Sequence, residues 1–284
     1  MSIELKNVTY TYMPKTPFER TAIKQINLKI CKGEFVAIIG HTGSGKSTLV
    51  QHLNGILKPT SGSVSIDGID LHGKKDAAKT VRSKVGMVFQ YPEHQLFEET
   101  IYADIAFGPK NLGLSTEEVD ARVRRAMAFA GLDFSAYAER SPFQLSGGQM
   151  RRVAIAGVIA LEPEYLILDE PSAGLDPRGR DEIFQEIAKL YQRSGIAVIL
   201  VSHNMEDVAK LATRLIVMND GQISLDGTPQ AVFGEPDKLK AAGVDVPPVT
   251  ALLGKLKTRG LNINDQLLTV DEAVANIIQA LGER

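Results

Sequence analysis

A glycine-rich segment near the N-terminus carries residue types that bind a nucleoside triphosphate. It begins at Gly40, ends in Lys46-Ser47, and follows the wholly apolar run Phe35–Ile39. That run predicts a buried strand and the apolar spacing after Ser47 predicts a helix, which is the context of a G-x-x-x-x-G-K-S phosphate loop. Lys46 would reach the β- and γ-phosphates and Ser47 would ligate Mg²⁺. The alternative is a glycine-rich turn before an ordinary helix. The predicted nucleotide contacts are Gly40, His41, Thr42, Gly43, Ser44, Gly45, Lys46, Ser47 and Thr48.

Two carboxylates, Asp169 and Glu170, stand at the end of a second predicted strand, residues 165–168. In an open parallel sheet, ligands bind beyond the carboxyl ends of the strands. Both carboxylates would therefore lie beside the phosphate loop if the two strands are neighbours. Asp169 suits the shell of Mg²⁺, and Glu170 is placed to orient or deprotonate an attacking water. The alternative for this pair is a simple strand-ending turn.

Two further predicted strands end in polar residues. His203 follows the apolar run 196–201, where it could contact the γ-phosphate and Glu170, and Gln90 closes the run 85–89, where it could reach Mg²⁺ or the attacking water. A histidine or a glutamine at a strand end is more often structural. Four strand ends that deliver phosphate-handling groups to one sheet edge predict a nucleotide-hydrolysing site.

The motif Leu145-Ser146-Gly147-Gly148-Gln149 precedes a predicted helix over residues 150–161. The free N–H groups at the start of that helix would form a second anion site. The phosphate loop of one subunit binds only one triphosphate. A second anion site in the same chain therefore needs a separate explanation. The alternative is an ordinary helix cap.

Together these motifs resemble those of the ABC ATPases, over residues 1 to about 233. The Walker A loop matches the glycine-rich segment, Walker B ends at Asp169 with Glu170 as catalytic glutamate, and His203 matches the switch histidine. The resemblance implies ATP as ligand and a head-to-tail dimer, in which the signature motif caps the partner's γ-phosphate. Three further motifs complete the match: the Q-loop at Gln90, the D-loop at residues 172–176, and the signature motif with Ser146, Gly147, Gly148 and Gln149. Tyr12 is the candidate for adenine stacking, with Tyr10 on the same alternating strand as runner-up, and either could be sheet packing.

The resemblance implies an α/β fold: a P-loop, RecA-like core with an N-terminal antiparallel β subdomain and a helical subdomain at about residues 91–141. Short alternating strands at residues 1–32 and 62–68 agree with the β subdomain, and Ser115 to Glu118 is predicted as a capping box of a helix. Residues 234–284 form a mainly helical extension with two apolar stripes, which are expected to pack on the core or on a second subunit; an inert appendage is the alternative. The stripes are Val249, Leu252, Leu253, Leu256 and Val274, Ile277, Ile278, Leu281.

Composition narrows the possible partners and compartment. The 284 residues are 44% hydrophobic and 23% charged, as expected for one large domain with an extension. No apolar run approaches the roughly 18 residues needed to cross a bilayer, and the N-terminus lacks a secretory core. The single cysteine, Cys31, excludes an internal disulfide and suits a reducing cytosol. With a net charge of −2 and no basic block, no nucleic-acid partner is expected.

Three kinds of ABC-like function were compared. A lone cassette suits importers whose membrane subunits are separate chains. Soluble members acting on chromosomes or ribosomes carry long coiled coils or two cassettes, which this chain lacks. A small-molecule phosphotransferase would use the phosphate loop, but the signature motif and His203 argue against it.

Within the transporters, two segments resemble the second of the paralogous ATPases of energy-coupling factor (ECF) vitamin and metal-ion importers. They are Gln90-Tyr91-Pro92-Glu93-His94-Gln95-Leu96-Phe97 and the signature helix at 149–157. The resemblance implies a heterodimer with the paralogous ATPase, a membrane scaffold subunit that docks on the segment after Gln90, and a small substrate-binding membrane protein. It places the chain peripherally on the cytoplasmic face of the cell membrane. The alternative is an ordinary ABC importer of a metal ion or polar solute.

Overall fold

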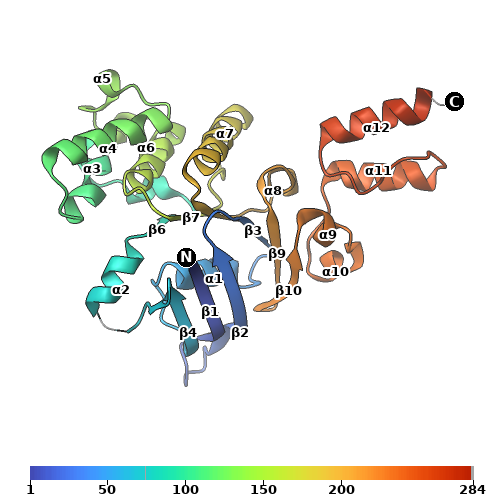
Figure 1. Cartoon of the computed structure of the whole chain (residues 1–284), viewed down its shortest axis with the longest axis horizontal. Helices are drawn as coiled ribbons and strands as arrows, with labels where there is room; N and C mark the ends of the chain where they lie inside the picture. The colour runs from blue at the N-terminus through green and yellow to red at the C-terminus, as the bar shows by residue number, and fades with distance from the viewer. Residues whose placement is uncertain (74, 283–284) are drawn as a thin grey trace.

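The computed structural model describes residues 1–73 and 75–282. Its centre is a six-stranded sheet of order β10-β9-β3-β8-β7-β6 (Figure 1). The runs predicted as buried strands are adjacent in this order, with β6 at one edge, and every residue of the four parallel strands β3, β8, β7 and β6 is buried. These are β3 (Phe35–Ile39), β8 (Ala197–Val201), β7 (Tyr165–Asp169) and β6 (Val85–Val88). At one edge, β9 (Arg214–Asn219) runs parallel to β3, and β10 (Gln222–Gly227) pairs with β9 antiparallel.

Strand β8 lies between the phosphate-loop strand β3 and the acidic strand β7, so these two are not neighbours. The register nevertheless brings their ends to one edge. Ile38 is paired with Val201, and Val201 in turn is paired with Asp169. The two strands are therefore not direct neighbours, but a parallel sheet aligns the carboxyl ends of more than two strands, so the carboxylates still lie at the edge where the phosphate loop begins.

A four-stranded antiparallel sheet of order β2-β1-β4-β5 packs against the first sheet through α1 (Lys46–Leu53), as the alternating N-terminal pattern predicted. Fully buried side chains of both sheets and of α1, among them Ile3, Ile38 and Leu49, form one apolar cluster. This packing fixes the start of α1, where the phosphate loop ends. The strands are β1 (Ser2–Tyr12), β2 (Arg20–Cys31), β4 (Ser61–Ile66) and β5 (Ile69–Asp70).

Helices follow β6, as expected, and gather at one end of the molecule (Figure 1). Val153 and Val123 from this region share a cluster with Leu166 and Leu200 of the six-stranded sheet, on the face opposite α1. The elements are η1 (Pro92–Gln95), α3 (Ile101–Asn111), α4 (Thr116–Phe129), α5 (Phe134–Tyr137), η2 (Pro142–Gln144) and α6 (Gly147–Ile159), while α2 (Lys75–Arg82) precedes β6 and α7 (Pro177–Ser194) and α8 (Met205–Leu211) flank β8.

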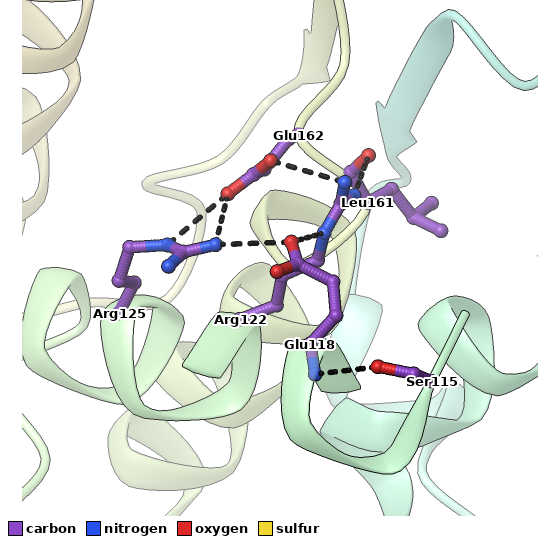
Figure 2. A network of polar contacts seen from close by, with 6 residues as sticks. All are labelled: Ser115, Glu118, Arg122, Arg125, Leu161 and Glu162. Carbon is purple, nitrogen blue, oxygen red and sulfur yellow. Dashed lines mark hydrogen bonds and ion pairs between the residues drawn. The ribbon is translucent and has the colours of Figure 1, made fainter. Parts of the chain in front are cut away.

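The predicted capping box of α4 is only half formed. The Ser115 hydroxyl accepts a hydrogen bond from the Glu118 N–H at 3.3 Å, but the Glu118 carboxylate accepts from Arg122 Nε at 2.9 Å instead of returning to Ser115. Figure 2 shows why: Arg122 and Arg125 lie between Glu118 and Glu162, and a carboxylate prefers such a charged partner. The network joins α4 to the turn that ends α6.

The predicted extension divides into two parts. The helices α9 (Pro229–Phe233) and α10 (Pro236–Ala241) pack on β3 and β9, whereas α11 (Pro248–Thr258) and α12 (Val270–Gly282) pair with each other at the end opposite the helical region (Figure 1). The stripe of α11 is mostly covered, but on α12 Val274, Ile278 and Leu281 remain exposed. Across the described ranges of the chain, the helices are too short or too polar to cross a membrane.

Candidate nucleotide site

A cleft of about 340 Å³ opens at the carboxyl edge of the six-stranded sheet. It brings together most of the residues predicted from the sequence to handle a nucleotide. These are Tyr12, Thr42, Gly43, Gly45, Lys46, Ser47, Thr48, Gln90, Asp169, Glu170 and His203. Gly40, His41 and Ser44 belong to the same loop but do not line the cleft, and the signature residues Ser146 to Gln149 lie elsewhere.

The phosphate loop needs glycine at two close backbone approaches. Gly40 has φ 152°, and a Cβ there would lie 2.3 Å from the Met218 carbonyl oxygen. Gly45 has φ 105°, and a Cβ there would lie 2.7 Å from the Ala22 carbonyl oxygen. Both backbone conformations favour glycine, so the loop shape follows from the spacing of its glycines.

Helix α1 begins at this loop without a side-chain cap and without an acidic residue in its first turn. Its first N–H groups are therefore free for an anion, with the positive end of the helix dipole behind them. Lys46 is buried, and its ammonium donates to the carbonyl oxygens of Gly40 at 2.7 Å and His41 at 2.9 Å. Burial lowers the pKa of Lys46, while Glu170 and Asp169 act in the opposite direction.

The carboxylates of Asp169 and Glu170 are largely buried, and burial disfavours their ionised forms. Burial raises the pKa of Asp169, against hydrogen bonding by the Ser47 hydroxyl and the charge of Lys46. Burial, reinforced by Asp169, raises the pKa of Glu170 to about 7. Glu170 has φ 52° and hydrogen-bonds through its N–H to the Val201 carbonyl. A carboxylate with a pKa near neutrality is matched to proton transfer at physiological pH.

His203 lies beside Glu170, with 3.3 Å between His203 Nε2 and Glu170 Oε1. Its ring is half exposed, and burial followed by the charge of Lys46 lowers its pKa. The helix α8 starts directly after it, capped by Asn204, whose side chain accepts from the N–H groups of Glu206 and Asp207. The strand β8 and this cap thus hold His203 at the edge of the cleft.

The two candidate tyrosines have different surroundings. Tyr12 is 37% exposed and lines the cleft, and its hydroxyl lies 3.2 Å from Thr48 Oγ1. Tyr10 packs against the core, edge to face with His52. This placement favours Tyr12 as the stacking residue.

Three lining residues were not found from the sequence: Arg20, Ala22 and Val201. The Arg20 guanidinium reaches within 3.3 Å of the place where a Cβ would stand on Gly43, so it adds a positive charge next to the loop. A single arginine at the start of a strand carries no motif, and only the packing of β2 beside the loop reveals its position.

The signature residues begin helix α6 as predicted. Ser146 and Gln149 form a capping box: the Ser146 hydroxyl accepts from the Gln149 N–H, and the Gln149 side chain accepts from the Ser146 N–H. The box leaves the N–H groups of Gly147 and Gly148 free at the positive end of the helix. These N–H groups lie outside the cleft, where the sequence predicted a second anion site.

Comparison with known proteins decides the family. The model of the ABC transporter family matches residues 23–173. The energy-coupling factor transporter ATP-binding protein EcfA2 of Clostridium tetani is 57% identical over 284 residues, which cover 100% of this chain and 99% of that protein. The EcfA2 protein of Clostridium perfringens is 54% identical over 281 residues, covering 99% of each. The chain belongs to the EcfA2 family of ABC ATPases.

Solved structures agree with this membership. The structure of cbiO1 from Clostridium perfringens, part of the ABC transporter complex cbiONQ, has a TM-score of 0.72 at 38% identity and covers 84% of this chain and 93% of that one. The dimeric ATP-binding cassette MJ0796 in a post-hydrolysis state bound to ADP and Pi has a TM-score of 0.72 at 34% identity, covering 80% and 98%. The predicted fold and the identification as an ECF-type ABC ATPase are confirmed.

Proposed function

We propose that this EcfA2-family chain hydrolyses ATP in a head-to-tail heterodimer with a paralogous ATPase, and that the dimer drives uptake of vitamins or other micronutrients. The observation that carries the proposal is the separation of two anion sites. One is the cleft with Lys46 and Glu170, and the other is formed by the free N–H groups of Gly147 and Gly148. A second subunit turned head to tail would supply the phosphate for the latter. The cassette MJ0796, which is 34–35% identical to this chain, is dimeric in its solved structures, and this supports a dimer.

In this proposal residues 1–233 are the ATPase domain, with the helical subdomain at about 91–141, and residues 234–284 are an extension used in dimerisation. The chain would sit peripherally on the cytoplasmic face of the cell membrane. A membrane scaffold subunit would dock beside Gln90, where Tyr91, Phe97 and Phe107 are exposed and the two phenylalanine rings meet edge to face. A small substrate-binding membrane protein would select the solute.

The oxygen donors of the cleft suit Mg²⁺. The Ser47 hydroxyl, the Asp169 carboxylate and the Gln90 side-chain carbonyl are hard ligands of the kind that Mg²⁺ prefers, and Ser47 already hydrogen-bonds Asp169. These three residues would hold the ion together with the nucleotide. When bound, Mg²⁺ neutralises charge on the β- and γ-phosphates.

The protein's own groups would divide the remaining work. Glu170 takes the proton of the water whose oxygen attacks the γ-phosphorus, and the bond to the β-phosphate oxygen breaks as ADP leaves. Lys46 and the loop N–H groups hold the phosphates, and His203 contacts the γ-phosphate beside Glu170. Tyr12 stacks on the adenine. Ser146, Gly147, Gly148 and Gln149 cap the γ-phosphate bound by the partner.

Reconstitution tests this function directly. The chain is to be expressed with its paralogous ATPase, the scaffold and a substrate-binding membrane protein, purified as a complex and placed in vesicles. ATP-dependent solute uptake by the complete complex is the expected result. A stable homodimer that drives uptake through one dedicated permease pair would show an ordinary importer instead.

The replacement Gly148→Ala is expected to lower ATPase activity of the dimer without harming the fold. A Cβ at Gly148 would touch only Leu175 Cδ2, at an ordinary 3.6 Å, and alanine favours a helix. The added methyl would instead meet the partner's phosphate. Displacing one phosphate hydrogen bond worth ~1.5–3 kcal/mol predicts a fall in turnover of roughly tenfold or more.

The matched control is Gly254→Ala on α11, where a Cβ meets nothing within 4 Å. Steady-state ATPase assays and thermal unfolding of both variants make the comparison. Full activity of the Gly148→Ala dimer would show that the signature glycines do not approach a ligand.

The exposed stripe of α12 is proposed as part of the dimer contact, and Ile278→Glu should weaken the dimer. Ile278 is 66% exposed in the single chain. Burying an isoleucine contributes ~1.5–3 kcal/mol, so the dimer dissociation constant should rise about tenfold or more. Analytical ultracentrifugation measures it, with Ala251→Glu on α11 as the matched charge control. Equal dissociation constants for the two variants would remove α12 from the interface.

A further inference from the structure

A buried ion pair joins the signature helix to the segment after Gln90. Arg151 on α6 donates from Nε to Glu93 Oε2 and from Nη2 to Glu93 Oε1, both at 3.0 Å. The side chains of Arg151 and Glu93 are only 3% and 15% exposed. This two-pronged geometry fixes both the distance and the orientation of the partners.

Arg151 has no second acceptor within the described part of the chain. Its remaining nitrogen, Nη1, is buried and makes no hydrogen bond there, so the whole charge is satisfied through Glu93. Burying an arginine for packing alone would be costly, because a buried charge loses its hydration. The pair therefore calls for a role in setting the relative position of the two elements it connects.

Glu93 belongs to η1, which follows a strained turn. Tyr91 has φ 55°, in the left-handed region, and the Arg151 guanidinium stands 5.9 Å from the centre of its ring. Gln90, directly before this turn, lines the cleft of this chain. If Glu93 moves, either the backbone conformation of Tyr91 changes or Gln90 moves with it.

Arg151 lies in the second turn of α6, whose first turn carries Gly147 and Gly148. A helix moves as a stiff rod over such a distance, so any movement of its N-terminus carries Arg151 along. Arg151 is thus tied at once to the signature end of its own helix and, through Glu93, to the turn beside this chain's cleft.

We propose that the Arg151–Glu93 pair is a positioning link that makes the Gln90–Tyr91 turn follow the signature helix when the dimer closes. This inference rests on the proposed head-to-tail dimer, in which α6 meets the partner's ATP. Neither residue lines the cleft. Through this link, ATP bound at the partner's loop changes the placement of Gln90 in this chain and of the exposed Tyr91 side chain next to it.

A fluorescent side chain at Tyr91 can report movement of the Gln90–Tyr91 turn separately from dimer formation. The chain contains no tryptophan, so Tyr91→Trp places its single indole beside Arg151. The full chain is assembled with its paralogous ATPase, and the ATP-induced fluorescence change is compared with that of a dimer lacking the reporter. Dimer formation with ATP is measured on the same samples, because it reports the signature contact separately.

Four variants are compared in the reporter background: Glu93→Gln, Arg151→Lys, the exchange Glu93→Arg with Arg151→Glu, and the control Arg124→Gln, which breaks an exposed pair with Asp120 on α4. Glu93→Gln and Arg151→Lys should each still dimerise with ATP. Their ATP-induced fluorescence change should be at least about tenfold smaller than that of the parent, because residues in direct contact are energetically coupled. The exchange should restore it, and the control should match the parent.

Two results would overturn the link: a full fluorescence change in the single variants, or no restoration in an exchanged pair that folds and dimerises normally. If the single variants do not fold, the exchanged pair decides alone. A parent dimer that fails to form with ATP would instead contradict the proposed function. In the reconstituted transporter, the same variants should raise the ATP consumed per solute transported about tenfold, because hydrolysis continues without the matching movement.

Discussion

Replacing the glutamate after Walker B, Glu170→Gln, is expected to abolish ATP turnover at this chain's site while ATP binding is kept. The amide keeps the size and the backbone contact to Val201 but cannot accept the proton of the attacking water. General-base assistance contributes about 10²–10⁴-fold to a rate, so turnover at this site should fall by that factor. Single-turnover hydrolysis in a heterodimer disabled at the partner's site is the measurement.

The acidity of Glu170 adds a pH signature. Burial raises its pKa to about 7, so below that pH the carboxyl is increasingly protonated and cannot act as a base. The hydrolysis rate should therefore fall as the pH drops through neutrality. The residual rate of Glu170→Gln should not show this fall. A rate that is independent of pH between about 5.5 and 8 would assign proton transfer to another group.

Protein stability provides a control for the same variant. A carboxyl whose pKa is raised from 4.5 to about 7 on folding lowers the free energy of unfolding as the pH rises between these two values, and the loss stays constant above neutral pH, so there the neutral amide should be at least as stable as the parent. The matched substitution is Glu164→Gln, at the opposite end of β7, where Glu164 pairs with Lys32 and Lys84 away from the cleft. It should leave turnover unchanged. Substantial hydrolysis by Glu170→Gln in the disabled heterodimer would sink the assignment.

The second large effect is expected from Lys46→Ala, which should remove high-affinity ATP binding. Lys46 is 6% exposed and held by the loop carbonyls of Gly40 and His41, so its ammonium is already placed at the phosphate site. Charge-assisted hydrogen bonds contribute ~1.5–3 kcal/mol each, and losing two predicts a rise in the ATP dissociation constant of about a hundredfold or more. Isothermal titration of the chain with ATP and Mg²⁺ measures it.

The control for this variant is Lys24→Ala, which removes an exposed positive charge from β2. It should bind ATP like the parent, since its charge lies outside the lining of the cleft. An unchanged affinity in folded Lys46→Ala would show that backbone N–H groups alone hold the triphosphate.

Much of the fold followed from local sequence. The runs 35–39, 165–168 and 197–201 are apolar, as expected of strands buried on both faces, and this made the positions of β3, β7 and β8 predictable to within a residue or two. The capping box of α4 is only half formed because Arg122 and Arg125 compete for the Glu118 carboxylate. Whether β3 and β7 are neighbours could not be read from the sequence, because strand order depends on the path of the whole chain, and β8 lies between them.

The residue types expected to carry out the chemistry could be predicted from the sequence alone. The phosphate loop depends on backbone conformations within a few residues, which the spacing of Gly40, Gly45 and Lys46 specifies directly. Which distant groups join that site or connect to it depends on the packing of the folded chain. Three placements depend on how separate elements pack. They are the position of Arg20 next to the loop, that of Tyr12 rather than Tyr10 in the cleft, and the pairing of Arg151 with Glu93. No short pattern encodes such contacts, because each joins residues far apart in the chain through the shared core.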